Sequence, residues 1–350
     1  VSIDTSFFVS AQITEKLIFG QPFFERHVET YDYSTNTVNL SEGRDHIATF
    51  DGVAAVDERS SVKTAFPKLF DESFLGGRIK TKPIKIKLRK ATGYERRTTP
   101  PLNSFSERKT ISAWIDKAIA EDIIESCEEG SFVSTIFTVA KKGTQERRPV
   151  TPFFGLNSQL VTPSFPMPRP DVILAEIRGD YFTSLDLRSS FFQFSVEEES
   201  RNLLTFATHR GLFRYKVLPM GLTISPSINQ AELSKMLQRY LFKTCVLYID
   251  DVLVYTRGSL ENHLKQLYDI LHTLQSHQVA LNYKKCRFGT RQTTFLGYLI
   301  TPEGRQVDTG RIQTLKEMPY PRTLRQLRSL IGGLQWFRHS VPHAAMLLEP

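Results

Sequence analysis

The sequence predicts an α+β fold divided into two or three domains. Apolar residues recur at helical spacing in three stretches, residues 104–123, 259–277 and 323–334. Short apolar runs rich in β-branched and aromatic residues lie between these stretches, above all at 132–140 and 244–256. A chain of 350 residues is long enough for several hydrophobic cores, so separate domains are expected.

The composition argues against a membrane span and against a disulfide framework. No apolar run approaches the length of about 18 residues that a membrane helix needs, and no secretory signal is recognised. The three cysteines, Cys127, Cys245 and Cys286, are too few and too scattered for a disulfide scaffold or a zinc cluster. We therefore expect an intracellular protein with reduced thiols, and the start at Val1 suggests a piece of a longer product.

The net charge of +8 is unevenly distributed. Residues 1–79 contain 7 Lys or Arg and 12 Asp or Glu, a net charge of −5, so residues 80–350 carry +13. A polyanion is the partner that such a basic excess favours, since neutralised phosphates release counterions. The alternative is a solvated basic surface without a partner.

The first 97 residues form three segments of different composition. Residues 1–40 alternate short β-like runs with polar breaks. Residues 41–77 are polar and poor in periodicity, which predicts a linker that need not pack. Residues 78–97 then carry nine basic residues and a single acid, Glu95. Apolar and basic residues alternate there, which predicts an extended strand with one basic face toward a neighbouring element or a nucleic-acid backbone.

A helix and a hairpin are predicted next. Ser104 and Glu107 have capping-box spacing at the start of a helix. Trp114 lies on its apolar stripe, which favours a core position over base stacking. The runs 132–140 and 149–154 predict the two arms of a hairpin, and the tip between them reads KKGTQERR. The basic residues of this tip could fold over a triphosphate, the alternative being a solvated turn. They are Lys141, Lys142, Arg147 and Arg148.

Acidic residues stand at the ends of short apolar strands. Asp250 and Asp251 interrupt the apolar run TCVLYIDDVLVYT, which predicts a tight hairpin with both carboxylates at its tip. Asp186 ends a similar run, and neighbouring strands would bring all three carboxylates to one sheet edge. Like charges so close repel, and Mg²⁺, or Mn²⁺ as a substitute, would neutralise them with hard oxygen ligands. A polar turn without a metal is the alternative for the Asp-Asp pair.

These motifs resemble those of one family. LDLRSSFF, which starts at Leu185, and YIDD, which starts at Tyr248, place Asp186 and Asp250 64 residues apart. This order and spacing are similar to those of the polymerase part of gypsy-type long-terminal-repeat retrotransposon polyproteins, which are relatives of retroviral reverse transcriptases. The match runs from about Gly77 to the end of the chain.

The resemblance implies a right-hand polymerase with a ferredoxin-like palm sheet. Fingers and palm would span residues 78–305, and a thumb or connection segment would span 306–350. Residues 1–40 resemble the C-terminal tail of the retropepsin-like domain that precedes the polymerase, with 41–77 as the linker. Asp4 lies too close to that tail to be counted as a catalytic protease residue.

The resemblance also implies roles for particular residues. Asp186, Asp250 and Asp251 would be catalytic and would bind two Mg²⁺ ions together with the Leu187 carbonyl. The residues expected to bind the incoming nucleotide are Lys141, Arg148, Phe191, Met220 and Gly221. Among them, the bulk of Phe191 would exclude a ribose 2′-hydroxyl. The residues expected at the template and primer are Asn157, Pro226, Gln230, Phe295, Leu296, Gly297 and Tyr298.

The sequence departs from the family pattern in two places. Pro152 and Phe154 stand where the family usually has an Asp and an Arg, which puts template contact by that Arg in doubt. Met220 and Asn229 each replace a commoner Phe.

The implied function is RNA-directed DNA polymerisation by two-metal phosphoryl transfer. The expected partners are an RNA or DNA template with its primer, deoxynucleotides, and other polyprotein domains: protease upstream, ribonuclease H and integrase downstream. The expected location is the cytoplasm, including virus-like particles. Two alternatives remain open. One is a decayed or captured copy that only binds nucleic acid, and the other is a retropepsin-type aspartic protease.

Overall fold

The computed structural model describes residues 28–32, 37–40, 47–49, 58–73, 75–89, 103–140, 147–162, 165–307, 312–313, 317–336 and 346. The chain divides into two compact units, Val1–Ala65 and Phe66–Pro350. In the first unit, three strands form an antiparallel sheet in sequence order, and a helix follows them. They are β1 (Val28–Asp32), β2 (Thr37–Leu40), β3 (Ile47–Thr49) and α2 (Glu58–Ala65).

The expected retropepsin tail, residues 1–40, is described only in β1 and β2. Asp4 lies outside the described residues. The assignment of this segment to a protease therefore stays a prediction.

The second unit begins earlier than the sequence suggests. The short helix η1 (Pro67–Phe70) buries Leu69 completely. The Leu69 carbonyl accepts a hydrogen bond from the backbone N–H of Leu281 at 2.7 Å, and Phe66 packs edge-on against Tyr268. The three large apolar side chains of FPKLF are buried, and their burial stabilises a packed segment in place of a solvated linker. The linker expected over residues 41–77 is therefore too long at its C-terminal end.

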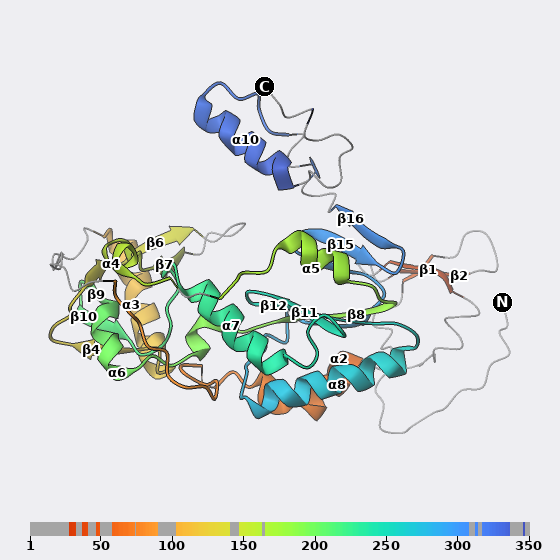
Figure 1. Ribbon diagram of the computed structural model, residues 1–350, viewed down its shortest axis with the longest axis horizontal. Coiled ribbons are helices and arrows are strands. Elements are labelled where there is room, and N and C mark those ends of the chain that lie inside the picture. Colours follow the sequence, from red (N-terminus) through yellow and green to blue (C-terminus); the bar gives the residue numbers. More distant parts are fainter. Residues whose placement is uncertain are drawn as a thin grey trace. The chain divides into compact units, whose positions relative to one another are not determined.

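The predicted palm is a four-stranded sheet whose neighbours are all antiparallel, in the order β11-β12-β8-β13. Its strands are β8 (Tyr181–Asp186), β11 (Cys245–Tyr248), β12 (Asp251–Thr256) and β13 (Arg287–Thr290). Helix α7 (Ser225–Leu237) precedes β11, and α8 (Leu260–Ser276) connects β12 to β13. Counted along the chain, the sheet order is second, third, first, fourth, which is the ferredoxin-like arrangement that was predicted. Helices α7 and α8 contact strands of this sheet (Figure 1).

Helix α8 packs on this sheet through a leucine stripe. Ser259 caps the helix by accepting the Asn262 N–H, and the buried leucines include Leu267, Leu271 and Leu274. The predicted helix is confirmed within one residue at each end. His263 joins the stripe as well, although the leucine spacing does not indicate it. It is fully buried, and its ring nitrogens lie 2.8 Å from the hydroxyls of Thr183 on β8 and Thr256 on β12.

The predicted fingers contain a helix, a second sheet and a hairpin. The helix is α3 (Phe105–Ala120), and the capping box between Ser104 and Glu107 is present. The sheet has the order β4-β10-β9-β5, and the hairpin pairs β6 with β7. These strands are β4 (Ile124–Cys127), β5 (Val133–Thr135), β6 (Phe137–Ala140), β7 (Arg147–Val150), β9 (Thr205–Thr208) and β10 (Gly211–Tyr215). Trp114 contacts Phe206 and Tyr215 with ring centroids 6.0 and 6.2 Å apart, as a core position requires.

The remaining elements connect these parts. They are α4 (Phe154–Gln159), α5 (Pro170–Glu176), η2 (Ser190–Gln193), α6 (Glu198–Arg201), η3 (Asn202–Leu204), β14 (Thr293–Phe295), β15 (Tyr298–Thr301), β16 (Gly304–Val307) and α10 (Leu324–Trp336). In place of the strand predicted over residues 78–97, residues 79–89 form isolated bridges at Ile84 and Leu88, and residues 90–97 lie outside the described residues. Across the described ranges, no helix has the length and apolar character needed to cross a membrane.

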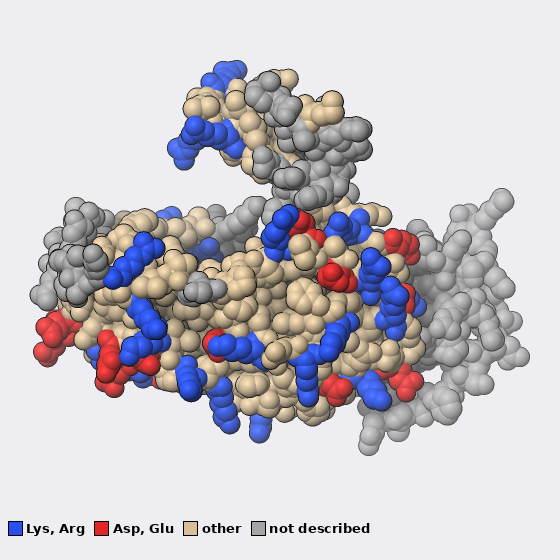
Figure 2. Space-filling view, viewed as in Figure 1, with Lys and Arg blue, Asp and Glu red and all other residues tan. Residues whose placement is uncertain are grey.

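Lys and Arg side chains are spread over the face that presents α7 and α8 (Figure 2). This distribution agrees with the basic excess that the sequence assigns to residues 80–350.

Candidate active site

Three carboxylates lie at one edge of the palm sheet. Asp186 is the last residue of β8 and Asp251 is the first of β12, and the ladder places them directly opposite each other. Asp250 is the second residue of the two-residue turn between β11 and β12, which Tyr248 and Asp251 close as a pair. Ile249, the first turn residue, has a φ of 57°, which is uncommon for a β-branched side chain. The hairpin with both acids at its tip is therefore present as predicted.

The carboxylates disfavour one another's charge. Although Asp251 is exposed, its pKa is raised to about 6, first by partial desolvation of its carboxyl group and then by the charges of Asp250 and Asp186. The pKa of Asp186 is also raised, chiefly by burial, with a smaller contribution from Asp250. Because both shifts disfavour the charged form, a cation bound at this edge would be stabilising.

One protein cation already reaches the site. Nζ of Lys285 lies 3.4 Å from Oδ2 of Asp186, and its charge lowers the pKa of both Asp186 and Asp251 against the effects just described. The turn that carries Lys285 is fixed to the strand, since the Asn282 N–H donates to the Asp186 carbonyl at 2.8 Å. Sequence reasoning missed Lys285, which lies 99 residues from Asp186 in the chain.

Helix α7 holds the acidic turn through two buried amides. Oε1 of Gln230 accepts the Ile249 N–H at 2.6 Å, and Nε2 of Gln230 donates to the Leu247 carbonyl at 3.3 Å. Nδ2 of Asn229 donates to the Ile249 carbonyl at 2.9 Å. Gln230 was predicted to contact the template, but its side chain is 3% exposed and bonds to the hairpin. Any effect of Gln230 on the template would have to be indirect.

Phe191 and Phe192 are both half-buried. Phe192 stacks on Tyr215 with ring centroids 6.3 Å apart. The turn that carries them is tied to α7, because Ser190 donates from its hydroxyl to Oδ1 of Asn229 at 2.8 Å. Asn229 therefore links the Phe191 turn to the acidic turn, a role that no sequence pattern indicated.

The loop before α7 approaches the fingers closely. Gly221 has a φ of 94°, and a Cβ at this position would lie 2.5 Å from the Thr151 carbonyl oxygen. Glycine is therefore required both for the backbone conformation and for the close approach. Met220 beside it is 45% exposed, and Pro226 lies in the first turn of α7.

Asn157 ties this loop to α4. Its Nδ2 donates to the Gly221 carbonyl at 2.9 Å, and its Oδ1 accepts the Thr223 N–H at 2.9 Å. Both ends of the amide are thus used inside the protein. The predicted template contact of Asn157 would also have to be indirect.

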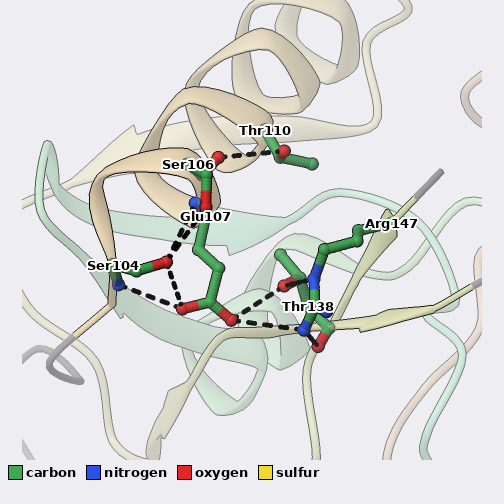
Figure 3. A network of polar contacts seen from close by, with 6 residues as sticks. All are labelled: Ser104, Ser106, Glu107, Thr110, Thr138 and Arg147. Atoms are coloured by element: carbon green, nitrogen blue, oxygen red, sulfur yellow. Dashed lines mark hydrogen bonds and ion pairs between the residues drawn. The ribbon is translucent and has the colours of Figure 1, made fainter. Parts of the chain in front are cut away.

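The fingers hairpin is clamped to α3 (Figure 3). Oε1 of Glu107 accepts from the Thr138 hydroxyl at 3.0 Å and lies 3.4 Å from Nη2 of Arg147. Arg147 also donates to the Thr138 hydroxyl at 2.7 Å and to its carbonyl at 2.8 Å. Arg147 is therefore a structural residue of the hairpin, although it is exposed like Arg148, the next residue on β7. Lys141 lies outside the described residues.

The residues expected at the primer lie in the β14–β15 hairpin. Leu296 and Gly297 form its tip, both with positive φ; Leu296 is half-buried and Gly297 is buried. Phe295 and Tyr298 are 4% and 7% exposed and pack into the core that also contains Phe182 of β8. The contact of these four residues with a primer stays a prediction.

The donor set at the acidic edge suits a hard cation. Carboxylate oxygens are preferred Mg²⁺ ligands, and the raised pKa values show the charge that a cation would relieve. Leu187 lies opposite Leu281 in an isolated antiparallel bridge. The two hydrogen bonds of this bridge involve the Asp186 carbonyl and the Arg188 N–H, so the bridge does not use the Leu187 carbonyl. Within the described residues, no three His, Cys, Asp or Glu side chains are close enough to hold a metal as they stand.

Comparisons with known proteins agree with this geometry. Residues 139–300 match the family model described as reverse transcriptase (RNA-dependent DNA polymerase). The chain is 28% identical over 299 residues to the retrovirus-related Pol polyprotein from transposon opus of Drosophila melanogaster, covering 83% of this chain and 29% of that protein. It is 27% identical over 240 residues to the Pol polyprotein from transposon gypsy of the same organism, covering 67% and 23%. The chain thus spans less than a third of either relative.

A solved structure shares the fold. The foamy viral protease-reverse transcriptase in complex with an RNA/DNA hybrid superposes with a TM-score of 0.71 at 21% identity. The aligned part covers 81% of this chain and 38% of that one. The predicted right-hand polymerase fold is confirmed by this likeness.

Proposed function

This chain is related to the reverse transcriptase region of long-terminal-repeat retrotransposon Pol polyproteins, and from that relationship we propose that it is an RNA-directed DNA polymerase. The observation that carries the proposal is the register that sets Asp186 opposite Asp251, with Asp250 in the adjoining turn. A primer 3′ end would be extended with deoxynucleotides at this edge.

In the proposed reaction, Asp186, Asp250, Asp251 and the Leu187 carbonyl would hold two Mg²⁺ ions. Such ions, when bound, make the primer hydroxyl more acidic and neutralise the triphosphate. The protein's part is positioning: Gln230 and Asn229 fix the acidic turn, and Arg148, with Lys141, would bind the phosphates. Phe191 would contact the sugar, and Leu296 and Gly297 would approach the primer strand.

In this scheme, Lys285 and a bound metal ion would compete for the carboxylate of Asp186. Without metal it neutralises part of the acidic edge through Asp186. A divalent cation bound by the same carboxylate would compete with that ion pair, since both use the Asp186 oxygens.

A second candidate function is nucleic-acid binding without catalysis. Two observations favour it: Pro152 and Phe154 replace the usual Asp and Arg of the family pattern, and the carboxylates do not form a ready three-ligand group among the described residues. The basic excess of residues 80–350 would suffice for such binding.

Primer extension on an RNA template with Mg²⁺ tests the proposal. Wild type should incorporate deoxynucleotides, and Asp186→Asn or Asp250→Asn should remove the activity while duplex affinity stays nearly unchanged. Asp269→Asn, which changes an exposed acid on α8, is the matched control and should stay active. If either active-edge variant kept activity within about tenfold of wild type, roughly 1.4 kcal/mol, the assignment would fail. Retained affinity without any extension by wild type would favour the second candidate.

A further inference from the structure

A pocket of about 590 Å³ lies at the end of the palm sheet that is remote from the three carboxylates. It is formed where α5 leads into β8, where β12 ends and where β15 turns into β16. Asp251 is the first residue of β12 and Thr256 is the last. At roughly 3.4 Å per residue, the strand therefore separates the pocket from the acidic edge by about 17 Å. None of the lining residues takes part in the proposed reaction.

Three arginines line this pocket, each from a different segment. Arg178 follows α5, Arg257 follows β12 and Arg305 lies on β16. All three are exposed, and no described residue forms an ion pair or a hydrogen bond with their guanidinium groups. A guanidinium group binds a carboxylate or a phosphate through two parallel hydrogen bonds. The pocket therefore offers three such groups to an anionic ligand.

Backbone contacts fix the segments that carry the first two arginines. The Asp180 N–H donates to the Thr256 carbonyl at 2.8 Å, and Oδ2 of Asp180 accepts the Gly258 N–H at 2.7 Å. A Cβ at Gly179 would lie 2.9 Å from the Thr256 carbonyl oxygen, so only glycine permits the two segments to approach so closely. The backbone of both arginines is thus held in place before a ligand binds.

The third arginine is fixed by the β15–β16 hairpin. Arg305 lies opposite Ile300 in the antiparallel ladder, and residues 302–303 form the turn between the strands. Ile300 is 2% exposed and belongs to the same apolar core as Leu174 of α5 and Tyr255 of β12. All three arginines therefore stand on segments that pack against one core, which lowers the entropy lost when a ligand binds them.

The arginines are surrounded by apolar and acidic side chains. Leu174, Ile177 and Ile300 belong to the lining, and Ile177 is half-buried. The two acidic residues of the lining, Asp180 and Glu303, form no ion pair with a described residue. A row of nucleic-acid phosphates would be repelled by these carboxylates and would gain nothing from the apolar lining. Arginine beside apolar surface is instead typical of the well-packed centre of a protein–protein interface.

We propose that this pocket binds an acidic segment of a partner protein. Asp or Glu side chains of the segment would pair with Arg178, Arg257 and Arg305, and an apolar side chain would pack against Ile177. Arginine clusters recognise acidic motifs in this way in several kinds of protein. The inference goes beyond the proposed function and does not rest on it, because the pocket shares no residue with the acidic edge. A segment bound here would leave that edge uncovered.

Random peptides displayed on phage, selected on the full chain at about 0.15 M salt, test the pocket. The selection should enrich peptides that contain at least two acidic residues and an apolar residue. Their affinity is then measured with labelled synthetic peptides on a variant that combines Arg178→Gln, Arg257→Gln and Arg305→Gln. This variant should bind them at least about tenfold more weakly than wild type, because charge-assisted hydrogen bonds are lost. Since the three side chains are exposed, each single variant should also fold and should weaken binding by itself.

A second triple variant separates the pocket from the general basic charge of the protein. Lys109→Gln, Lys243→Gln and Lys265→Gln together remove the same charge from exposed positions outside the lining. This lysine variant should bind the selected peptides as wild type does. The arginine variant should lose no more affinity for a template–primer duplex than the lysine variant loses.

Four results would overturn the proposal. They are a selection that enriches no peptide, enriched peptides without acidic residues, acidic peptides that bind both variants equally, and a loss of duplex affinity confined to the arginine variant. The last result would assign the pocket to nucleic acid. Because no DNA synthesis is measured, a wild type that fails in primer extension would count against the proposed function alone.

Discussion

Ile249 donates its backbone N–H to the side chain of Gln230 at 2.6 Å, so the conformation of the acidic turn depends on α7. Replacing Gln230 by Met keeps the volume but leaves the Ile249 N–H and the Leu247 carbonyl without this partner. We expect a loss of about 1–3 kcal/mol in the free energy of unfolding.

The same variant separates positioning from binding. Gln230→Met should lower kcat for primer extension while KM for template–primer stays nearly constant, because the side chain is buried away from solvent. A raised KM with unchanged kcat would instead support the original prediction that Gln230 contacts the template.

Two titratable groups in the palm, His263 and Asp251, change the stability of the protein in opposite directions as the pH falls. Burial lowers the pKa of His263 to about 4, so stability that is present above its ordinary pKa of 6.5 is lost as the pH falls toward 4. The pKa of Asp251 is raised to about 6, so the metal-free chain gains stability as the pH falls through that value. In wild type these two effects partly cancel.

Asp251→Asn should expose the His263 effect. Without the compensating carboxyl group, the variant should lose stability more steeply than wild type between pH 7 and 5. The difference in the free energy of unfolding should be no more than about 1 kcal/mol, because solvent screens the exposed Asp251. Urea unfolding at both pH values measures the difference. Parallel curves for variant and wild type would show that Asp251 does not titrate in this range.

Phe191→Val tests sugar selection. The ring is half-buried and sits on a turn fixed by Ser190 and Asn229, so its removal should open space without unfolding the palm. We expect the variant to incorporate ribonucleotides that wild type rejects. Phe192→Val is the matched control, since Phe192 stacks on Tyr215. It should reduce stability and keep the preference for deoxynucleotides.

Arg148→Ala tests phosphate binding at the fingers. The exposed guanidinium should contribute about 1.5–3 kcal/mol to the nucleotide contact, so KM should rise for every deoxynucleotide. The salt slope of duplex binding should hardly change. Arg147→Ala is the comparison: it breaks the clamp on Glu107 and Thr138 and should loosen the hairpin, which lowers thermal stability. A flat KM with weaker duplex binding in Arg148→Ala would mean that the hairpin is a general basic patch.

The fold was largely readable because its signals are local. The capping box of Ser104 and Glu107, the helix that Ser259 begins and the hairpin of Asp250 are each specified by residues within a few positions of one another. The three carboxylates could also be placed, since strand ends carry them and neighbouring strands share an edge.

Side-chain roles were harder to predict because they depend on partners far along the chain. Asn157 and Gln230 stand in motifs for which the family resemblance implies contact with nucleic acid, yet their amides bond to the protein's own backbone. An amide can serve either purpose, and the sequence pattern is the same in both cases. Lys285 and His263 were missed for a related reason. Their partners, Asp186 and Thr183, lie 99 and 80 residues away.

The pairing of Asp186 with Asp251 also makes the site sensitive to changes in chain length. Side chains alternate between the two faces of a sheet, so inserting or deleting one residue in β8 or β12 would turn the carboxylate toward the opposite face. Such a change could leave a folded, nucleic-acid-binding protein. Under the proposed function, a single in-frame codon gained in either strand would abolish DNA synthesis while a folded product still accumulated.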